Sequence, residues 1–268
     1  MSENPLDYLR RIGEAGEGPH DIARAALMLA ILDHAEAALD PLLRHLFDIE
    51  TAMRAEAGMI RRVADGARVL AGLMHDRLGY DGDRVRYDDP GNADLVSVIA
   101  RRRGLPVALG ILYVHAARAA GMTACGLNTQ GHFLIRITHR QDDVTLDPFN
   151  GGAVVDRDHM PAELRGYDAR LAQPAGDVDV LLRLQNNLKQ RALETGQNER
   201  ALQITTRMAL IAPRRAELWF DMARINEAMG ILGAARAAYE KCLECTGQGG
   251  ALHNEAAVSL ATLKRRLN

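Results

Sequence analysis

The chain has 268 residues, 47% hydrophobic and 25% charged, a balance that excludes general disorder and is typical of a folded globular protein. Its formal net charge of -2 at pH 7 creates no strong positive electrostatic field that would attract a polyanion, so we expect no nucleic-acid partner. Three irregularly spaced cysteines argue against a disulfide framework and favour the cytoplasm, and we expect neither a signal peptide nor a membrane span.

The N-terminal third is predicted to be helical, from about residue 5 to residue 78. Apolar residues recur there at three- and four-residue spacing, which is the period of an amphipathic helix. Asn92 is expected to cap a further helix that ends at Gly104. Pro106 suits the first turn of the next helix, and Gly121 suits its end.

Beyond Gly121 the pattern becomes alternating, which predicts strands over residues 131–137, 144–149 and 153–156. Helices followed by a small antiparallel meander make an α+β domain. Residues 171–179 resemble a linker because they contain Pro174 and Gly176, and the chain after residue 180 is predicted to be all-helical.

The C-terminal part repeats with a period of 34 residues. Gly196 and Gly230 are one period apart, and so are Ala201 and Ala235. The pattern resembles tetratricopeptide repeats (TPRs) over residues 182–215 and 216–249, with residues 254–267 as a capping helix. Trp219 takes the early bulky position of the second unit, whereas Gln185 departs from the pattern in the first. A generic helical bundle is the alternative.

Cysteine spacing suggests one further site, because Cys242 and Cys245 are separated by two residues. No second pair completes a tetrahedral zinc site, so we interpret these cysteines as packing residues. His34 and His45 have no constellation that specifies a metal, and no phosphate-binding or dinucleotide-binding motif occurs. We therefore predict no metal and no cofactor.

Three segments together carry a family resemblance: Arg102–Gly110 (RRGLPVALG), Gly131–Arg136 (GHFLIR) and Leu146–Gly152 (LDPFNGG). In this order they resemble the bacterial SirB family, whose members join a transglutaminase-like core to TPRs. The resemblance covers roughly residues 20–265. It implies a helix-rich transglutaminase/papain-like domain with a small antiparallel sheet over residues 1–175, with a helical part at 1–90 and a core at 91–175. An all-α TPR array over residues 176–268 follows.

The parent fold places a cysteine at the N-terminus of a buried helix, a histidine on an adjacent strand and an aspartate on the next. The resemblance assigns His132 and Asp147 to the last two roles. They lie nearly symmetrically about a turn at residues 139–141, so they should meet across a hairpin. The cysteine position falls on about Pro106, and Val107 to Gly110 offer no thiol or hydroxyl.

Three interpretations of the His132–Asp147 pair stay open: a structural hydrogen bond, a ligand- or peptide-binding cleft, and noncovalent catalysis through an activated water. Cys125 is the only thiol of the first domain. It lies in a strand-like segment, so a small core residue is the simpler interpretation than a protease or transglutaminase nucleophile.

The resulting hypothesis is a non-catalytic interaction or regulatory scaffold that binds a protein or peptide through its TPR surface. The candidate binding residues are His132, Asp147, Trp219, Asn187 and Arg103. The alternative is a hydrolase or transferase that uses the His132–Asp147 pair.

Overall fold

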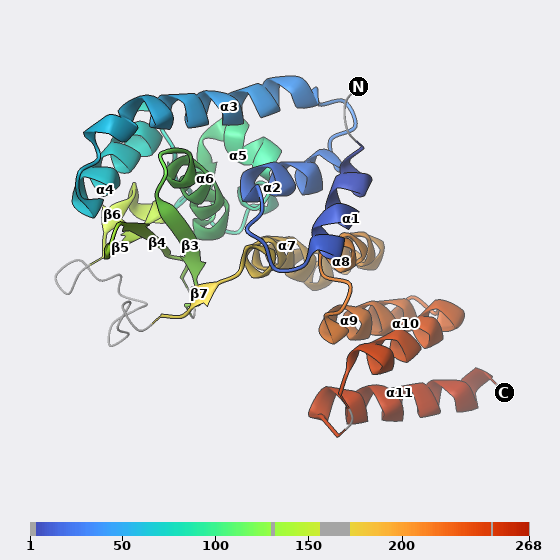
Figure 1. Cartoon of the computed structure of the whole chain (residues 1–268). Helices are drawn as coiled ribbons and strands as arrows, with labels where there is room; N and C mark the ends of the chain where they lie inside the picture. The colour runs from blue at the N-terminus through green and yellow to red at the C-terminus, as the bar shows by residue number, and fades with distance from the viewer. Residues whose placement is uncertain (1–3, 130–131, 156–171, 248, 268) are drawn as a thin grey trace. The chain divides into compact units, whose positions relative to one another are not determined.

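The computed structural model describes residues 4–129, 132–155, 172–247 and 249–267 (Figure 1). Contacts divide the chain into two compact units. One is Glu17–Leu184, and the other joins Met1–Gly16 to Gln185–Asn268. Helix α7 (Asp177–Glu194) begins in the first unit and ends in the second. The domain boundary that we placed at residues 175–176 stays a prediction.

The helices of the Glu17–Leu184 unit surround one central helix. They are α2 (Ile22–Ile31), α3 (Leu39–Glu56), α4 (Val63–Ala71), α5 (Leu95–Arg101) and α6 (Pro106–Ala119), with short helical turns η1 (Ala57–Met59), η2 (Gly72–Arg77) and η3 (Pro90–Asn92). Helix α6 is the central one, since every residue from its start to Ala117 is buried. As expected, Pro106 opens α6 and Gly121, with φ at +79°, follows its end.

The predicted N-cap of α5 was wrong by two residues. Asp94 caps this helix, and its carboxylate accepts a hydrogen bond from the Ser97 amide at 2.8 Å. Asn92 instead ends the η3 turn, where its side chain donates to the Arg86 carbonyl. A carboxylate two residues closer to the apolar run therefore replaces it as the cap.

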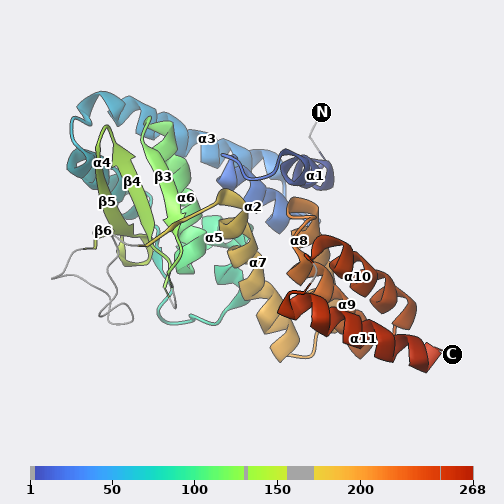
Figure 2. The same cartoon turned by 60° about the horizontal axis from the view of Figure 1, so that its bottom comes forward.

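A five-stranded antiparallel sheet packs against α6 (Figures 1 and 2). Its order is β6-β5-β4-β3-β7, formed by β6 (Ala153–Val154), β5 (Asp142–Asp147), β4 (Ile135–His139), β3 (Thr123–Leu127) and β7 (Pro174–Ala175). A separate parallel pair joins β1 (Asp81–Gly82) to β2 (Arg103–Gly104).

Strand positions differ from the predicted ones. The strand expected over residues 153–156 is β6, which ends at Val154, and the predicted strand residues 131 and 156 lie outside the described part of the chain. The strand expected over residues 131–137 begins at Ile135, and the one expected to reach residue 149 ends at Asp147, because Pro148 has no amide to continue the ladder. The predicted linker over residues 171–179 contains β7 and the start of α7.

Close packing fixes the sheet on α6. A Cβ atom added to Gly110 would lie 2.4 Å from the Phe133 ring, and one added to Gly126 would lie 2.7 Å from it. Both glycines are thus required by the approach of one aromatic ring. Phe133 holds β3 and α6 together just beyond His132 in the sequence.

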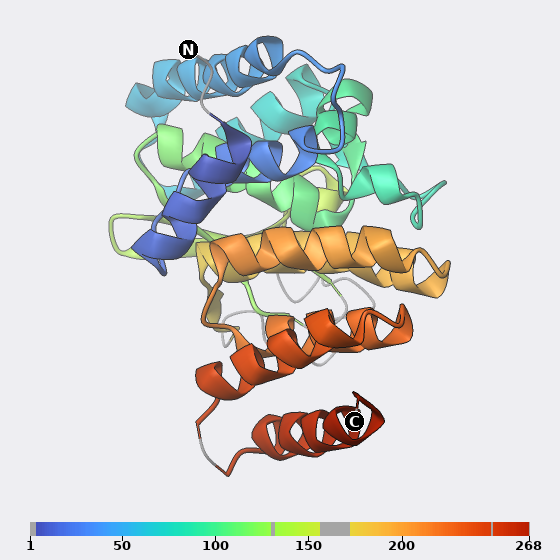
Figure 3. The ribbon, with the colours of Figure 1, turned by 90° about the vertical axis from the view of Figure 1, so that its right-hand side faces the viewer.

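The described residues of the second unit form helices and the turns that connect them (Figure 3). The helices are α1 (Pro5–Ala15), the end of α7, α8 (Asn198–Ile211), α9 (Ala216–Ala228), α10 (Leu232–Cys245) and α11 (Ala251–Leu267). Neighbouring helices from α8 to α11 pack in chain order, as stacked repeats do. Helix α1 packs on α8, where a Cβ atom at Gly13 would lie 2.1 Å from the Leu210 carbonyl oxygen.

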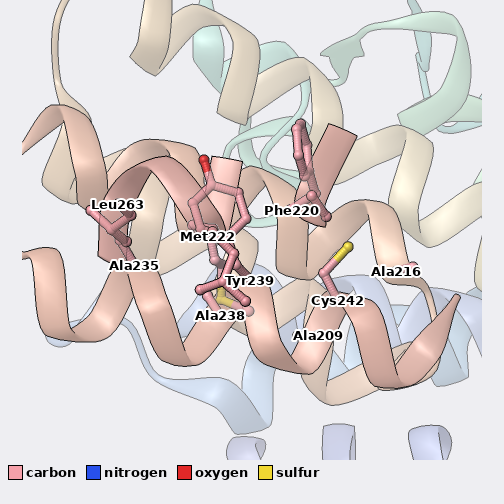
Figure 4. Packing of buried hydrophobic residues seen from close by; sticks show 12 residues of the cluster. Ala209, Ala216, Phe220, Met222, Ala235, Ala238, Tyr239, Cys242 and Leu263 are labelled. Carbon is pink, nitrogen blue, oxygen red and sulfur yellow. The ribbon is translucent and has the colours of Figure 1, made fainter. Parts of the chain in front are cut away.

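Small side chains let these helices approach closely. Ala201 and Ala235, one repeat apart, are both fully buried. The core around Ala235 contains Phe220 and Tyr239, whose rings meet edge to face with centroids 5.8 Å apart (Figure 4). Cys242 belongs to this core, and burial raises the pKa of its thiol to about 11. The packing interpretation of this cysteine agrees with its position.

Candidate functional site

Asp147 is the centre of a compact hydrogen-bonded group at the end of β5. Its Oδ2 lies 3.0 Å from His132 Nε2 and accepts a hydrogen bond from Asn150 Nδ2 at 2.6 Å. Its Oδ1 accepts from the amides of Phe149 at 3.0 Å and Asn150 at 3.3 Å. This carboxylate is 1% exposed and caps the short helix η4 (Pro148–Asn150). Asp147 is therefore fully used in holding the local fold.

His132 approaches Asp147 from the segment before β4, so the two predicted partners do meet. The residue is 8% exposed, and its ring packs edge-on against Phe149 with centroids 6.1 Å apart. With Nε2–H donating to Asp147, Nδ1 is the free acceptor, and it has no partner among the described residues. The pair thus retains one nitrogen that could accept a proton.

The start of α6 carries no nucleophile. Its first turn is Pro106, Val107, Ala108 and Leu109, all buried, and its N-cap residue Leu105 makes no side-chain cap. Helix α6 packs on η4, and its first turn offers neither a thiol nor a hydroxyl.

Cys125 lies on β3 opposite Arg136. No hydrogen bond joins it to His132 in the described residues. Burial raises the pKa of the Cys125 thiol, although the charges of Arg136 and Arg118 lower it in part. A more protonated thiol is a poorer nucleophile, so this geometry gives no support to Cys125 as one.

The long-range contacts of two arginines in the Glu17–Leu184 unit were not found from the sequence. Arg183 donates to the carbonyl oxygens of Thr129 at 3.0 Å and His132 at 2.8 Å, and its guanidinium lies 5.3 Å from the Phe133 ring centroid. Arg118 makes a bidentate pair with Asp177, with both distances 2.8 Å. No short motif links residues so far apart. Asn150, by contrast, could have been found. An aspartate followed by a proline often caps a turn, and Asn150 lies in the turn that Asp147 caps.

Of the other predicted binding residues, Arg103 belongs to the Glu17–Leu184 unit, whereas Trp219 and Asn187 belong to the second unit. Arg103 is exposed on β2, and its Nη1 donates to the carbonyls of Gly79 and Arg102. Trp219 is partly buried on α9, where its indole N–H donates to the Pro213 carbonyl at 2.8 Å. Asn187 is half-buried on α7. Their binding roles stay predictions.

A buried, nucleophile-free helix beside a histidine–aspartate hairpin, in a chain with stacked 34-residue helix pairs, defines a transglutaminase-like domain joined to TPRs. The sequence profile of the transglutaminase-like superfamily matches residues 34–186, more than half of the chain, and the tetratricopeptide repeat profile matches residues 188–268. The chain belongs to the transglutaminase-like superfamily.

Relatives agree with this assignment. A UPF0162 protein of Xylella fastidiosa (strain 9a5c) is 30% identical over 173 residues, 61% of this chain and 62% of its own length. F-box only protein 21 of Mus musculus is 31% identical over 98 residues, 35% of this chain and 16% of that protein. The chain thus spans less than two thirds of the curated relatives it matches. The UPF0162 relatives are SirB-like, which confirms the resemblance to that family.

One solved structure shares a distant likeness. A crystal structure of menin, described as revealing the binding site for Mixed Lineage Leukemia (MLL) protein, covers 90% of this chain and 70% of its own, at 12% identity and a TM-score of 0.45. Among the described residues, no helix combines the length and apolarity that crossing a bilayer needs.

Proposed function

We propose that this protein is a non-catalytic interaction scaffold that binds a protein or peptide partner through its TPR helices. The observation that carries the proposal is the first turn of α6, which has neither thiol nor hydroxyl. Asp147, the partner of His132, caps η4 with its carboxylate. Without a nucleophile, the His132–Asp147 pair has no route to a covalent acyl intermediate.

A partner surface is available on α9 and α11. TPRs generally mediate protein–protein interactions, and their stacked helices present extended binding surfaces. Arg224 of α9 pairs with Glu255 of α11 at 3.7 Å, with both side chains more than half exposed. Val258, one turn further along α11, is 68% exposed. This α9–α11 surface combines charge and exposed apolar area, and Trp219 and Asn187 would extend it.

The test is to capture the partner with the full chain and then rebuild the complex from purified components. The double variant Arg224→Glu, Val258→Asp changes only exposed side chains of the α9–α11 surface, so it should lose the partner while keeping its thermal transition. Val85→Asp is the matched control, since Val85 is 92% exposed on the Glu17–Leu184 unit. If the wild type, the double variant and the Val85→Asp control all bind the partner equally, the interface lies outside the α9–α11 surface. A chain that binds no protein but turns over a substrate would sink the scaffold proposal.

A second candidate is a hydrolase in which His132 activates a water, favoured by His132 Nδ1, which has no hydrogen-bond partner in the part of the chain that the structure describes. It requires an amide or ester substrate whose hydrolysis disappears in His132→Ala while the far-ultraviolet circular dichroism is unchanged. Equal turnover by the variant would remove this candidate.

We also propose a cytoplasmic location. All three cysteines are free thiols, which suits a reducing compartment. Fractionation of the native cell would test it, and recovery outside the cytoplasm would contradict it.

A further inference from the structure

Three consecutive arginines at the end of α5 have different surroundings. Arg101 is neutralised, with its Nη1 3.2 Å from Asp89 and 3.8 Å from Asp83. Arg103 is exposed and donates to two carbonyl oxygens. Arg102 is half-buried, and within the described parts of the chain no carboxylate lies within ion-pair distance of it. Arg103 also has no carboxylate partner among the described residues, but its side chain is exposed to solvent, so Arg102 is the half-buried cation of the three without a described counter-ion.

Neutral side chains hold Arg102 in place. Its guanidinium carbon lies 4.7 Å from the Tyr80 ring centroid, and its Nη1 contacts the Tyr80 hydroxyl and His45 Nε2, the latter at 2.5 Å. The Tyr80 hydroxyl also lies 2.7 Å from His45 Nε2. Since a guanidinium only donates, the hydroxyl accepts from Arg102 and donates to His45. Nη1 is therefore occupied, whereas Nε and Nη2 meet no acceptor among the described residues.

The cluster keeps one positive charge at neutral pH. Burial, together with the charge of Arg102, lowers the pKa of His45 to about 4, although the nearby Asp48 opposes this in part. Burial raises the pKa of Tyr80 to about 12, against the influence of Arg102. Both partners are thus neutral.

The backbone adds a second unusual feature. Arg102 has φ +57° and ψ +27°, the left-handed conformation that glycine and asparagine adopt at helix ends far more readily than arginine. Strained residues persist where the surroundings fix them, and they cluster at ligand sites. In this conformation Arg102 ends α5, and its guanidinium lies over the Tyr80 ring.

We propose that Arg102, positioned by Tyr80 and His45, binds an oxyanion group, a carboxylate or a phosphate, through its Nε and Nη2. These two donors form the side edge of the guanidinium fork, which matches the two oxygens of a carboxylate or phosphate. The site lies in the Glu17–Leu184 unit and does not depend on the proposed scaffold function.

The experiment titrates the full chain with inorganic phosphate and, separately, with acetate, at constant ionic strength set with chloride. Binding is followed calorimetrically and through the His45 imidazole resonances in NMR spectra. Saturable binding of one anion in preference to the other identifies the group. Arg102→Gln should weaken that binding at least tenfold. Arg103→Gln, which removes the same charge one residue away, should change it less than twofold.

Three results would overturn the site: no saturable shift of the His45 resonances in the wild type, binding unchanged in Arg102→Gln, or equal losses in both variants. Should Arg102→Gln fail to fold, Arg102→Lys is the substitute, because lysine keeps the charge but lacks the planar fork. Full affinity in Arg102→Lys would contradict bidentate binding.

Discussion

The two compact units bury their polar groups in different ways. In the Glu17–Leu184 unit, polar bonds join residues far apart in sequence, such as Arg118 with Asp177, 59 residues apart, and His45 with Arg102, 57 residues apart. In the second unit, which contains the repeats, some buried polar side chains bond within their own helix, although Lys189 of α7 pairs with Asp221 of α9. Thr205 and Asn226, for example, each donate to the carbonyl four residues earlier.

This difference indicates what specifies each unit. Long-range hydrogen bonds fix individual side chains in the Glu17–Leu184 unit, whereas close contact of small side chains sets the spacing of the repeat helices in the second unit. Loss of a polar partner should therefore damage the first unit most, and added volume should damage the second.

The largest effect is expected from Asp147→Ala. It leaves buried His132 and two backbone amides without their acceptor, which should lower the free energy of unfolding by about 3–5 kcal/mol. His132→Ala should cost less, because Asp147 keeps its three other donors. Urea denaturation of both variants measures the difference. A larger loss for His132→Ala would contradict a carboxylate-centred structural role.

Added volume in the repeat core should have the next largest effect. Ala235→Leu places three extra carbons at a fully buried position, and overpacking of this kind costs about 1–3 kcal/mol. Ala237→Leu, on the exposed side of the same helix, is the matched control and should stay within about 0.5 kcal/mol of the wild type. Thermal unfolding compares them. Equal effects would mean that close helix contact does not limit this unit.

Trp219→Phe should have a smaller effect. Phenylalanine keeps most of the packing but loses the indole hydrogen bond to the Pro213 carbonyl, a loss of about 1 kcal/mol. Differential scanning calorimetry measures the change. If stability is unchanged but affinity for the purified partner falls, Trp219 acts at the binding surface rather than in the turn.

The smallest effect concerns pH and His115, which links α6 to α2 and α3. Burial lowers its pKa, but the hydrogen bond and charge of Asp21, with lesser help from the Leu46 carbonyl and Glu50, outweigh burial and leave the pKa raised. A raised pKa stabilises the fold below the unfolded value of about 6.5, and the gain is lost as pH rises through the folded value.

The stability difference between wild type and His115→Gln should therefore shrink from about pH 5.5 to about pH 8.5, by under ~1 kcal/mol. The pKa of Asp21 is lowered, so this carboxylate stays ionised across the range. Asp21→Asn should flatten the dependence, and urea titrations at each pH test both statements. A stability difference that grows with pH would contradict a raised pKa of His115 in the folded protein.

The features that could be predicted from the sequence are those that depend on local signals, and the long-range contacts could not be predicted. Local signals were sufficient for the start of α6 at Pro106, for the hairpin that brings His132 to Asp147, and for the repeat period marked by Ala201 and Ala235. Each depends on residues a short distance apart or on a regular period. The pairing of Arg118 with Asp177 has no such signature, because only the folded chain brings the two together.

The packing of α1 on α8 has a consequence for synthesis. Gly13 is buried against Leu210, yet the whole Glu17–Leu184 unit lies between them in the chain. On a ribosome α1 emerges first and waits for its docking surface, on the order of ten seconds or more at usual translation rates. During that interval α8, on which α1 packs, has not been made, whereas Leu9 and Ile12, which are buried in the folded chain, already have. Nascent chains paused before α8 should therefore bind chaperones through α1, and release them once α8 has been made.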